Sequence, residues 1–370
     1  MHSKRTVIIG GTGLVGCYLA ADLLSKGHQV TVLSKSTRFA VPEAFVSPAE
    51  MQKVELVHGE ITDVELLSDL IGRADVVFHK TVSQGMSGAV ENLQQFLNDK
   101  IGAAAAVVEA LRLAPQKPEL LVLGSSISVY GEGAYQCPRC GVVRPDLRYQ
   151  APRSESGWDP KCPACDGSGL TPVPLDEQAA RKGLSVYSVS KKAEEDLFAG
   201  ACQRNSISMV GLRYSFIIGA GQSWHSPFTH FLDLLSAAEP PRLHEDGLQT
   251  RDYIFVRDVV AANMAVMKKH RPGTNFYNIA SGNSTTLLAT VNELSELYAQ
   301  RSGSGRALEP IVDRVFSPGD VRHCYVTAEK FGRDFGIEPP TALSAGLREL
   351  VDWYVRKKES QIQGIGAGSS

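Results

Sequence analysis

The chain has 370 residues, 43% of them hydrophobic, so it is long enough to bury one large core or two closely packed ones. Its formal net charge of −2 gives no overall field for nucleic acid or an anionic membrane. The apolar run near the N-terminus is too short for a signal peptide, and no later stretch approaches a membrane span. We therefore expect a cytoplasmic protein that binds neither membranes nor nucleic acid.

The first segment predicts a strand, a glycine-rich turn and a helix. Residues 6–9 are β-branched, residues 10–16 are Gly-Gly-Thr-Gly-Leu-Val-Gly, and residues 17–26 have helical periodicity. Glycines at this spacing permit a tight turn, let a pyrophosphate approach backbone N–H groups and allow the helix to pack closely on the strand. The turn therefore predicts a dinucleotide site, with candidate residues Gly10, Thr12, Gly13, Leu14 and Gly16.

A second expected strand, at residues 29–33, ends at Ser34-Lys35-Ser36. Sites for NAD usually have an acidic residue at this point, which binds the ribose hydroxyls. A small hydroxyl followed by a cation suits the 2′-phosphate of NADP instead, and Arg38 is a second cation nearby. Ser34, Lys35 and Arg38 therefore favour NADP without excluding NAD, although Lys35 could equally be a solvated surface lysine.

Further along the chain, strand-like and helical segments alternate. We expect strands at residues 54–58, 74–79, 120–124 and 209–214, with helices at 64–71, 91–113 and 186–203. This alternation predicts an α/β fold with a doubly wound parallel sheet, and the chain has no internal repeat of solenoid period.

Two segments carry candidate catalytic residues. The expected strand at 120–124 leads into Ser126, and the helix at 186–203 begins with Tyr187 and Lys191, which share one helix face. A lysine ammonium favours the phenolate form of a nearby tyrosine, which can then take a proton from an alcohol while hydride leaves the carbon. Ser126 would hold the same oxygen. Together with the dinucleotide turn, these residues predict a catalytic set.

Between these segments lie two identical spacings, Cys137-Pro-Arg-Cys140 and Cys162-Pro-Ala-Cys165. Two such pairs can complete the tetrahedral thiolate shell that Zn²⁺ prefers, and four thiolates leave no open position for a substrate. The chain has seven cysteines, an odd number that argues against a disulfide framework. The spacing therefore predicts a structural zinc site, with disulfides or unrelated thiols as the weaker alternatives.

These segments together resemble the extended short-chain dehydrogenases/reductases, in the nucleotide-sugar epimerase and dehydratase family. The likeness covers most of residues 5–356. It also rests on Gly-Leu-Gln-Thr-Arg-Asp at 247–252, Asn-Ile-Ala-Ser-Gly at 278–282 and Pro-Gly-Asp-Val-Arg at 318–322. The resemblance implies a Rossmann-type sheet, a smaller C-terminal α/β substrate domain, a bound NAD(P) cofactor, a nucleoside-diphosphate sugar as substrate and a homodimer.

The resemblance also assigns residues by position. Glu60 and Ile61 contact the adenine, Thr81 lies near the cofactor, and Arg251 binds the diphosphate of the sugar nucleotide, which a guanidinium fork matches well. The alternative for Arg251 is a salt bridge to neighbouring acidic side chains. Arg322 is a further substrate candidate, in place of an arginine that family members often carry before Gly-Asp.

Departures from the family pattern bear on the reaction. The family's 4,6-dehydratases place Asp and Glu directly after the position of Ser126, whereas this chain has Ile127 and Ser128. Lys80 stands where relatives often have leucine, with either a place near the cofactor or a surface position, and Phe216 stands where epimerases often have asparagine. We therefore expect an epimerase that transiently oxidises C4 and re-reduces it, with Tyr187 as acid and base.

Two alternatives stay open. One is an NADPH-dependent keto-sugar reductase or another sugar-nucleotide dehydrogenase, which Ser34 and Lys35 would favour. The other, from a different class, is a non-catalytic, dinucleotide-sensing adaptor.

The domain boundaries follow from the same likeness. We expect the dinucleotide-binding domain at 1–133, 171–215 and 252–281, the substrate domain at 216–251 and 282–360, and a flexible tail at 361–370. Residues 134–170 interrupt the family connection, and their few apolar side chains would need a bound metal to fold. We interpret them as an inserted zinc ribbon that acts as a lid near the sugar pocket or as a subunit contact.

Overall fold

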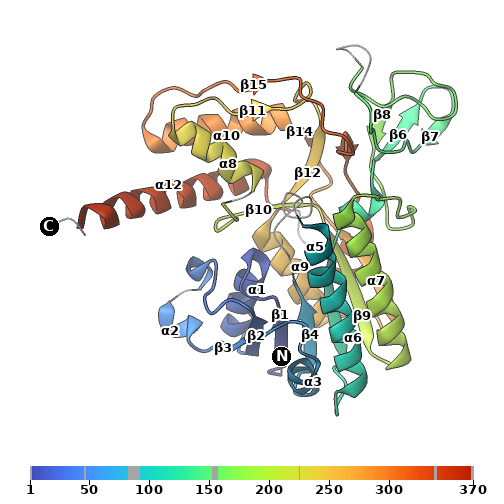
Figure 1. The fold of residues 1–370 in the computed structure, drawn as a ribbon, viewed down its shortest axis with the longest axis vertical. Helices are drawn as coiled ribbons and strands as arrows, with labels where there is room; N and C mark the ends of the chain where they lie inside the picture. The colour runs from blue at the N-terminus through green and yellow to red at the C-terminus, as the bar shows by residue number, and fades with distance from the viewer. Residues whose placement is uncertain are drawn as a thin grey trace.

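The computed structural model describes residues 2–45, 47–81, 92–151, 157–224, 226–336 and 340–367. At its centre is a seven-stranded sheet in the order β13-β9-β5-β4-β1-β2-β3, in which every neighbouring pair is parallel (Figure 1). The predicted doubly wound parallel sheet is confirmed. Its strands are β1 (Arg5–Ile9), β2 (Gln29–Ser34), β3 (Glu55–His58), β4 (Val76–His79), β5 (Leu120–Ser126), β9 (Ser208–Tyr214) and β13 (Thr274–Ile279).

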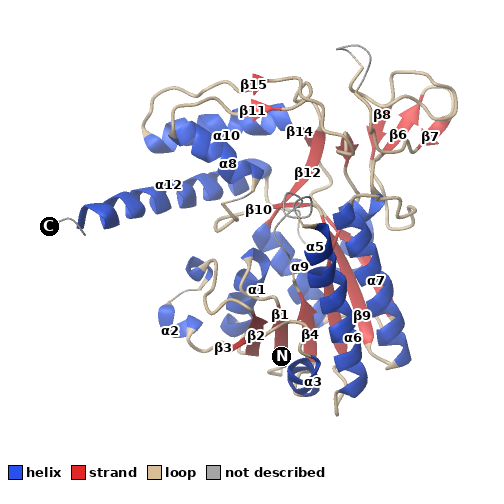
Figure 2. Ribbon diagram, viewed as in Figure 1, coloured by secondary structure: helices blue, strands red, loops and turns tan. Residues whose placement is uncertain are grey.

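Helices cover both faces of this sheet, as the blue helices flanking the red strands in Figure 2 indicate. One face carries α1 (Leu14–Ser25) and α9 (Val256–Lys268), and the other carries α3 (Val64–Gly72), α6 (Ala103–Leu113) and α7 (Val186–Arg204). Neighbouring strand residues alternate between the two cores: Ile8 packs on the α1 side, whereas Val7 and Ile9 pack on the α6 side. Burial on both faces explains why these strands are almost continuously apolar.

The helix expected at 91–113 is divided into three parts. They are α5 (Leu93–Leu97), the π-helical turn η2 (Asn98–Gly102) and α6. Residue 91 lies outside the described residues. A π-turn inserts one extra residue into the helix and re-aims the side chains around it. Here it turns Lys100 into the interior, where that side chain is buried.

Most elements after β9 form a second layer, whose helices α8, α10 and α12 lie at the upper left of Figure 1, whereas α11 packs against β13. A small sheet pairs β12 with β10, β14 and β16, while β11 pairs with β15. The bounds are β10 (Phe216–Ile218), α8 (Pro227–Ser236), β11 (Arg242–Leu243), β12 (Thr250–Phe255), β14 (Ser284–Thr286), α10 (Leu287–Ser302), β15 (Ile311–Val312), β16 (His323–Cys324), α11 (Glu329–Phe335) and α12 (Leu343–Ala367). Among the described residues, no helix is long and apolar enough to cross a membrane.

Helix α12 takes in most of the segment expected as a tail, since its backbone stays helical to Ala367. The lysine, glutamate and glutamine residues before Gly364 are good helix formers, which agrees with this helical backbone. The flexible tail expected at 361–370 stays a prediction.

The cysteine insert forms its own three-stranded antiparallel sheet in the order β7-β6-β8, with β6 (Ala134–Cys137), β7 (Gly141–Val143) and β8 (Thr171–Val173). The short 3₁₀ helix η3 (Ile127–Tyr130) connects the end of β5 in the large sheet to the start of the insert. In Figure 1 the insert lies at the upper right, beside the segment that carries β16. The remaining short elements, η1 (Pro42–Ala44) and α2 (Pro48–Met51), follow β2.

Gly16→Ala tests the close packing of the glycine turn. A Cβ at Gly16 would clash with the backbone of Gly11, which a side chain cannot relieve by changing rotamer. We expect the free energy of unfolding in urea to fall by about 2 kcal/mol and dinucleotide affinity to fall at least about tenfold. Gly200→Ala in α7 is the control, since its added Cβ would meet no described atom within 4 Å. Unchanged stability and affinity in Gly16→Ala would contradict this account.

Candidate active site

The glycine turn lies where the strand order of the sheet reverses, because β1 has β2 on one side and β4 on the other. Gly10 has a φ of +79°, which favours glycine, and a Cβ there would come within 2.8 Å of Thr81 Cα. Gly13 is the exposed N-cap of α1, and Leu14 begins that helix. The turn thus presents the N-terminus of α1, a favourable place for a pyrophosphate, at the switch point of the sheet.

The residues after β2 make a different set of contacts from those expected for a 2′-phosphate site. The Ser34 hydroxyl is buried and lies 2.7 Å from the Thr12 hydroxyl. The exposed Lys35 ammonium forms an ion pair with Glu60 at 2.7 Å, and this hydrogen bond raises the pKa of Lys35. Arg38 is exposed. The sequence did not pair Lys35 with Glu60 because the contact joins the ends of two neighbouring strands.

Ile61 and Thr81 are the other residues assigned to the cofactor. Ile61 is half-buried and packs against the core on the α6 side. Thr81 is buried, its hydroxyl lies 2.9 Å from His79 Nε2, and its backbone oxygen accepts a hydrogen bond from Lys100 Nζ at 2.9 Å. Gly10 and Thr81 therefore hold the ends of β1 and β4 in contact.

Lys80 is buried, so the surface alternative for this residue was wrong. Its Nζ donates to the Tyr214 hydroxyl at 2.9 Å, and the side-chain amide of Asn263 in α9 donates to the same hydroxyl at 2.9 Å. Burial, followed by repulsion from Lys191, lowers the pKa of Lys80 well below its ordinary value. The same causes lower the pKa of Lys100 to about 7.

The three predicted catalytic residues come from adjacent elements, because α7 packs against both β5 and η3. Ser185 caps α7 by accepting a hydrogen bond from Ser188 N, which places Tyr187 in the first helical turn. One turn later, Lys191 is buried and donates to Gly124 O at 2.9 Å and to Glu194 at 2.8 Å. Ser126 ends β5, and its hydroxyl accepts from Ser128 N at 3.1 Å.

The buried carboxylate of Glu194 sets the charge of this lysine. Burial is the largest single influence and by itself would lower the pKa of Lys191, but the attractions of Glu194 and Tyr187 and the hydrogen bond to Glu194 together outweigh it, so the pKa lies above its ordinary value. Lys191 therefore stays an ammonium next to the tyrosine. The arrangement suits proton exchange between an alcohol and the Tyr187 hydroxyl.

A buried ion-pair network supports this set and was not predicted. Arg213 of β9 binds both carboxylate oxygens of Glu195 at 2.9 Å, and the Ser125 hydroxyl donates to the same carboxylate at 2.6 Å. Arg213 also donates to the Tyr130 hydroxyl at 2.9 Å. A charged residue inside an otherwise apolar strand, as Arg213 is, was the sequence signal for a buried partner.

Both predicted substrate arginines have acidic partners. Arg251 of β12 pairs at 3.2 Å with Asp320, an acidic residue far from it in the sequence rather than one of its neighbours along the chain. Arg322 is buried, and its guanidinium is held by Asp159, Glu245 and Asp246 at 2.7, 3.2 and 2.6 Å. The side chain of Arg322 thus faces protein carboxylates, one of which comes from the cysteine insert. Spacing along the chain gave no sign of these partners.

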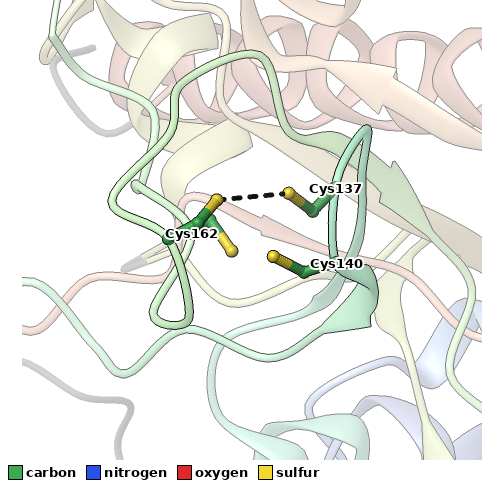
Figure 3. Close-up of side chains that lie close together, drawn as sticks. Cys137, Cys140 and Cys162 are labelled. Atoms are coloured by element: carbon green, nitrogen blue, oxygen red, sulfur yellow. Dashed lines mark hydrogen bonds between the residues drawn. The ribbon is translucent and has the colours of Figure 1, made fainter.

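The four predicted cysteines meet in one cluster. Their sulfur atoms all lie within 4.8 Å of one another, and Cys137, Cys140 and Cys162 point toward a common centre in Figure 3. The Cys137 and Cys165 sulfurs are 3.8 Å apart, the edge of a tetrahedron with Zn–S bonds of about 2.3 Å. The residues therefore fit a four-thiolate metal site.

Lys100→Met tests the burial of this amine through the pH dependence of stability. The pKa of Lys100 is about 7 in the folded chain and about 10.5 in its ordinary environment. Between these values the unfolded state binds more protons, so the lysine makes the free energy of unfolding rise with pH. The variant should lose a slope of about 1 kcal/mol per pH unit in urea titrations at pH 7.5 to 9.5. Lys53→Met, at an exposed lysine, should keep the slope; an unaltered slope in Lys100→Met would contradict the prediction.

Comparison with known proteins agrees with this arrangement. The profile of the NAD dependent epimerase/dehydratase family matches residues 6–152 and 167–280, and the gap between the two matches falls inside the cysteine insert. A dTDP-L-rhamnose 4-epimerase of Burkholderia thailandensis is 26% identical over 365 residues, which cover 96% of each chain.

Two solved structures have the same fold at low identity. A UDP-N-acetylglucosamine 4-epimerase from Methanobrevibacter ruminantium, in complex with UDP-N-acetylmuramic acid, has a TM-score of 0.75 at 20% identity and covers 96% of this chain and 100% of its own. A UDP-glucuronic acid 4-epimerase from Bacillus cereus, in complex with UDP-glucuronic acid and NAD, has a TM-score of 0.73 at 20% identity and covers 95% and 99%. Since the family profile matches most of the sequence, this chain belongs to the NAD dependent epimerase/dehydratase family.

Proposed function

We propose that this protein is a nucleoside-diphosphate-sugar 4-epimerase with a bound nicotinamide cofactor. The observation that carries the proposal is the Tyr187–Lys191 pair, which packs against the end of β5 at Ser126 with the buried Ile127 next in the chain. A 4,6-elimination would need an acid and a base near C5 and C6, and the positions after Ser126 carry neither. Relatives that cover about 95% of this chain include 4-epimerases and 4,6-dehydratases, and of these the one with the highest identity, 26%, is named as a 4-epimerase, which favours the same reaction here.

Each residue of the set has a role in moving one proton. Tyr187 takes the proton of the C4 hydroxyl and later returns it, and the Lys191 ammonium stabilises the phenolate between these events. Ser126 donates a hydrogen bond to the C4 oxygen as it becomes a carbonyl. A bound nicotinamide would supply the hydride acceptor and donor for this exchange at C4. Inversion would require the sugar to present its other face before C4 is reduced again.

The contacts around Lys35 favour NAD as this cofactor. A 2′-phosphate at the end of β2 would lie next to the Glu60 carboxylate, which already pairs with Lys35. Like charges at this distance oppose each other. The buried Ser34 hydroxyl is likewise engaged with Thr12. The exposed Arg38 still favours NADP and, with it, the keto-sugar reductase.

We propose that Cys137, Cys140, Cys162 and Cys165 hold a structural Zn²⁺. Backbone N–H donors, that of Arg139 first, lower the pKa of Cys137 to about 7, whereas hydrogen bonding with Cys165 raises the pKa of Cys140. Four crowded thiols cannot all ionise without a cation, and a thiolate is the form that binds zinc. The apolar cluster of the insert is small, so a metal would supply much of its stability.

A homodimer is the assembly that we propose. Helices α6 and α7 pack side by side, and apolar side chains on them, Leu113, Val189 and Leu197, are exposed. Exposed apolar side chains on a helix pair are suited to burial against a second copy.

Turnover without added cofactor tests the epimerase. The purified protein should interconvert UDP- or dTDP-hexoses at C4, followed by NMR, and should release NAD on heating. Tyr187→Phe should retain the dinucleotide but lose about 100-fold or more in kcat. Tyr298→Phe, in α10, is the matched control and should keep full activity. Strict dependence on added NADPH would instead support the reductase, and dinucleotide binding without turnover of any sugar nucleotide would support the dinucleotide-sensing adaptor.

Metal analysis tests the cysteine site. Plasma mass spectrometry should find one zinc per chain in the wild-type protein. Cys140→Ser should lower this content and the free energy of unfolding by about 2 kcal/mol or more, because an open shell binds metal weakly. Cys202→Ala, at a buried cysteine of α7 outside the cluster, should retain its zinc. Unchanged metal content in Cys140→Ser would remove this site from the proposal.

A further inference from the structure

The cysteine insert is fastened to the substrate region at its base. Glu132, just before β6, is buried and accepts hydrogen bonds from Arg322 N at 2.8 Å and His323 N at 3.0 Å. The hydroxyl of Tyr135, in β6, donates to the same carboxylate at 2.6 Å. A Cβ at Gly133 would clash with the backbone oxygen of His323, so the two segments approach as closely as a glycine allows. Glu132 thereby joins the start of the insert to the backbone of β16.

The far loop of the insert makes a second set of contacts to the same region. Asp159 accepts hydrogen bonds from Arg322 Nε at 2.7 Å and lies 3.2 Å from His323 Nε2. Arg148 pairs with the buried Glu245 at 2.9 Å. The ring of Trp158 stacks on Phe316 with the ring centres 6.5 Å apart. We call Glu132, Arg148 and Asp159 the clamp.

From the clamp, hydrogen bonds lead to the arginine assigned to the diphosphate. β16 pairs with β12 in parallel, with His323 opposite Thr250 and Cys324 opposite Arg251. The His323 ring lies 2.9 Å from the Thr250 hydroxyl, and Arg322 O accepts from Arg251 Nη1 at 3.1 Å. Asp159 thus contacts two of the residues that hold β12 at Arg251, whose guanidinium also pairs with Asp320 at 3.2 Å.

The metal site connects the two halves of the clamp. Cys137 lies two residues after Tyr135, and Cys162 lies three residues after Asp159. Apart from the sulfurs, the apolar core that joins these loops consists of little more than Tyr135, Leu170 and Val143. Without a metal, that core is too small to hold the Asp159 loop against the β6 hairpin.

We propose that the metal-holding insert positions Arg251 for the diphosphate of the substrate, with Asp159 as the positioning residue that acts through Arg322 and His323. This inference rests on the proposed function for the identity of the ligand. Asp159 does not touch the substrate. It orders β16 against β12, and Arg251 takes its place from that pairing.

Asp159→Asn tests the inference in the full-length, metal-loaded protein. The substitution removes one charge at a largely exposed side chain. The dissociation constant of UDP, by titration calorimetry, should rise about tenfold, a typical size for losing the partner of a binding residue. KM for the sugar nucleotide should rise by the same factor, with kcat and bound dinucleotide unchanged. Asp159→Glu should recover part of the loss.

Asp166→Asn is the matched control. Asp166 is exposed on the same insert, pairs only weakly with Lys161 at 3.3 Å, and has a φ of 53°, which asparagine tolerates. Its UDP affinity should equal that of the wild type. A tenfold loss in this control as well would show that any change in the insert matters, and would overturn the role of Asp159.

Metal removal provides a coupling test. Chelation of the wild-type protein should also raise the dissociation constant of UDP about tenfold, whereas chelation of Asp159→Asn should add little, because the connection is already broken. If chelation raises the dissociation constant of UDP about tenfold in Asp159→Asn as well, the metal and Asp159 act on UDP binding independently, and the proposal is overturned.

Amide hydrogen exchange separates this proposal from the proposed function, since it needs no substrate. Asp159→Asn and metal removal should each increase exchange at residues 250–251 and 322–324 but leave β1 and β4 unchanged. If exchange changes in this way while no sugar nucleotide is bound or converted, the clamp stands and the proposed function fails. If exchange and UDP affinity both stay at wild-type values in Asp159→Asn, the clamp fails.

Discussion

The parallel register of β1, β4 and β5 is the constraint on which the site depends. Hydrogen bonding places Ile9, His79 and Leu123 in one row across the sheet. The residues that follow them, Gly10, Lys80 and Gly124, therefore lie at the same height, where β1 and β4 end and β5 continues to Ser126. The glycine turn, the buried lysine and the acceptor of the Lys191 ammonium share one edge for this reason. A slip of one residue in any of the three strands would reverse which face each side chain occupies.

Buried charges fill the space behind this edge, and their pairing decides what they contribute. Two successive glutamates of α7 each have their own cationic partner: Glu194 pairs with Lys191, and Glu195 pairs with Arg213. A buried ion pair adds little net stability compared with apolar packing, yet loss of one partner leaves a costly unpaired charge. The pairs are therefore better understood as fixing the direction of α7, and hence of Tyr187, than as a source of stability.

The parts of the site with local spacing rules were predictable from sequence. The glycine turn, the Tyr187–Lys191 pair and the two cysteine pairs each depend on residues a few positions apart, and spacing alone brings such residues together. The sheet was predictable for the same reason, except that β13 was missing from the expected strands, since its two asparagines weaken the pattern of a strand.

What could not be predicted depends on contacts between distant segments. The partners of Arg322 lie on the insert and on the loop before β12, and no pattern near residue 322 specifies them. The pairing of Lys35 with Glu60 likewise joins distant segments, and it is the contact that favours NAD over NADP in our proposal. The π-turn at Lys100 depends on a small shift in helical hydrogen bonding that helical periodicity does not resolve.

The close fit at Gly133 and Glu132 has a consequence for how such an insert could be gained or exchanged during evolution. An inserted domain that contacts the rest of the protein (its host) only through its two connecting segments can be replaced as a module, because only those segments need to match. This insert instead supplies an acidic partner to a buried host arginine and takes a buried host glutamate as a partner of its own. Removal of the insert would leave Arg322 and Glu245 without these partners, so the insert and host sequences must change together. In this chain the insert and the substrate region are therefore expected to evolve as one unit.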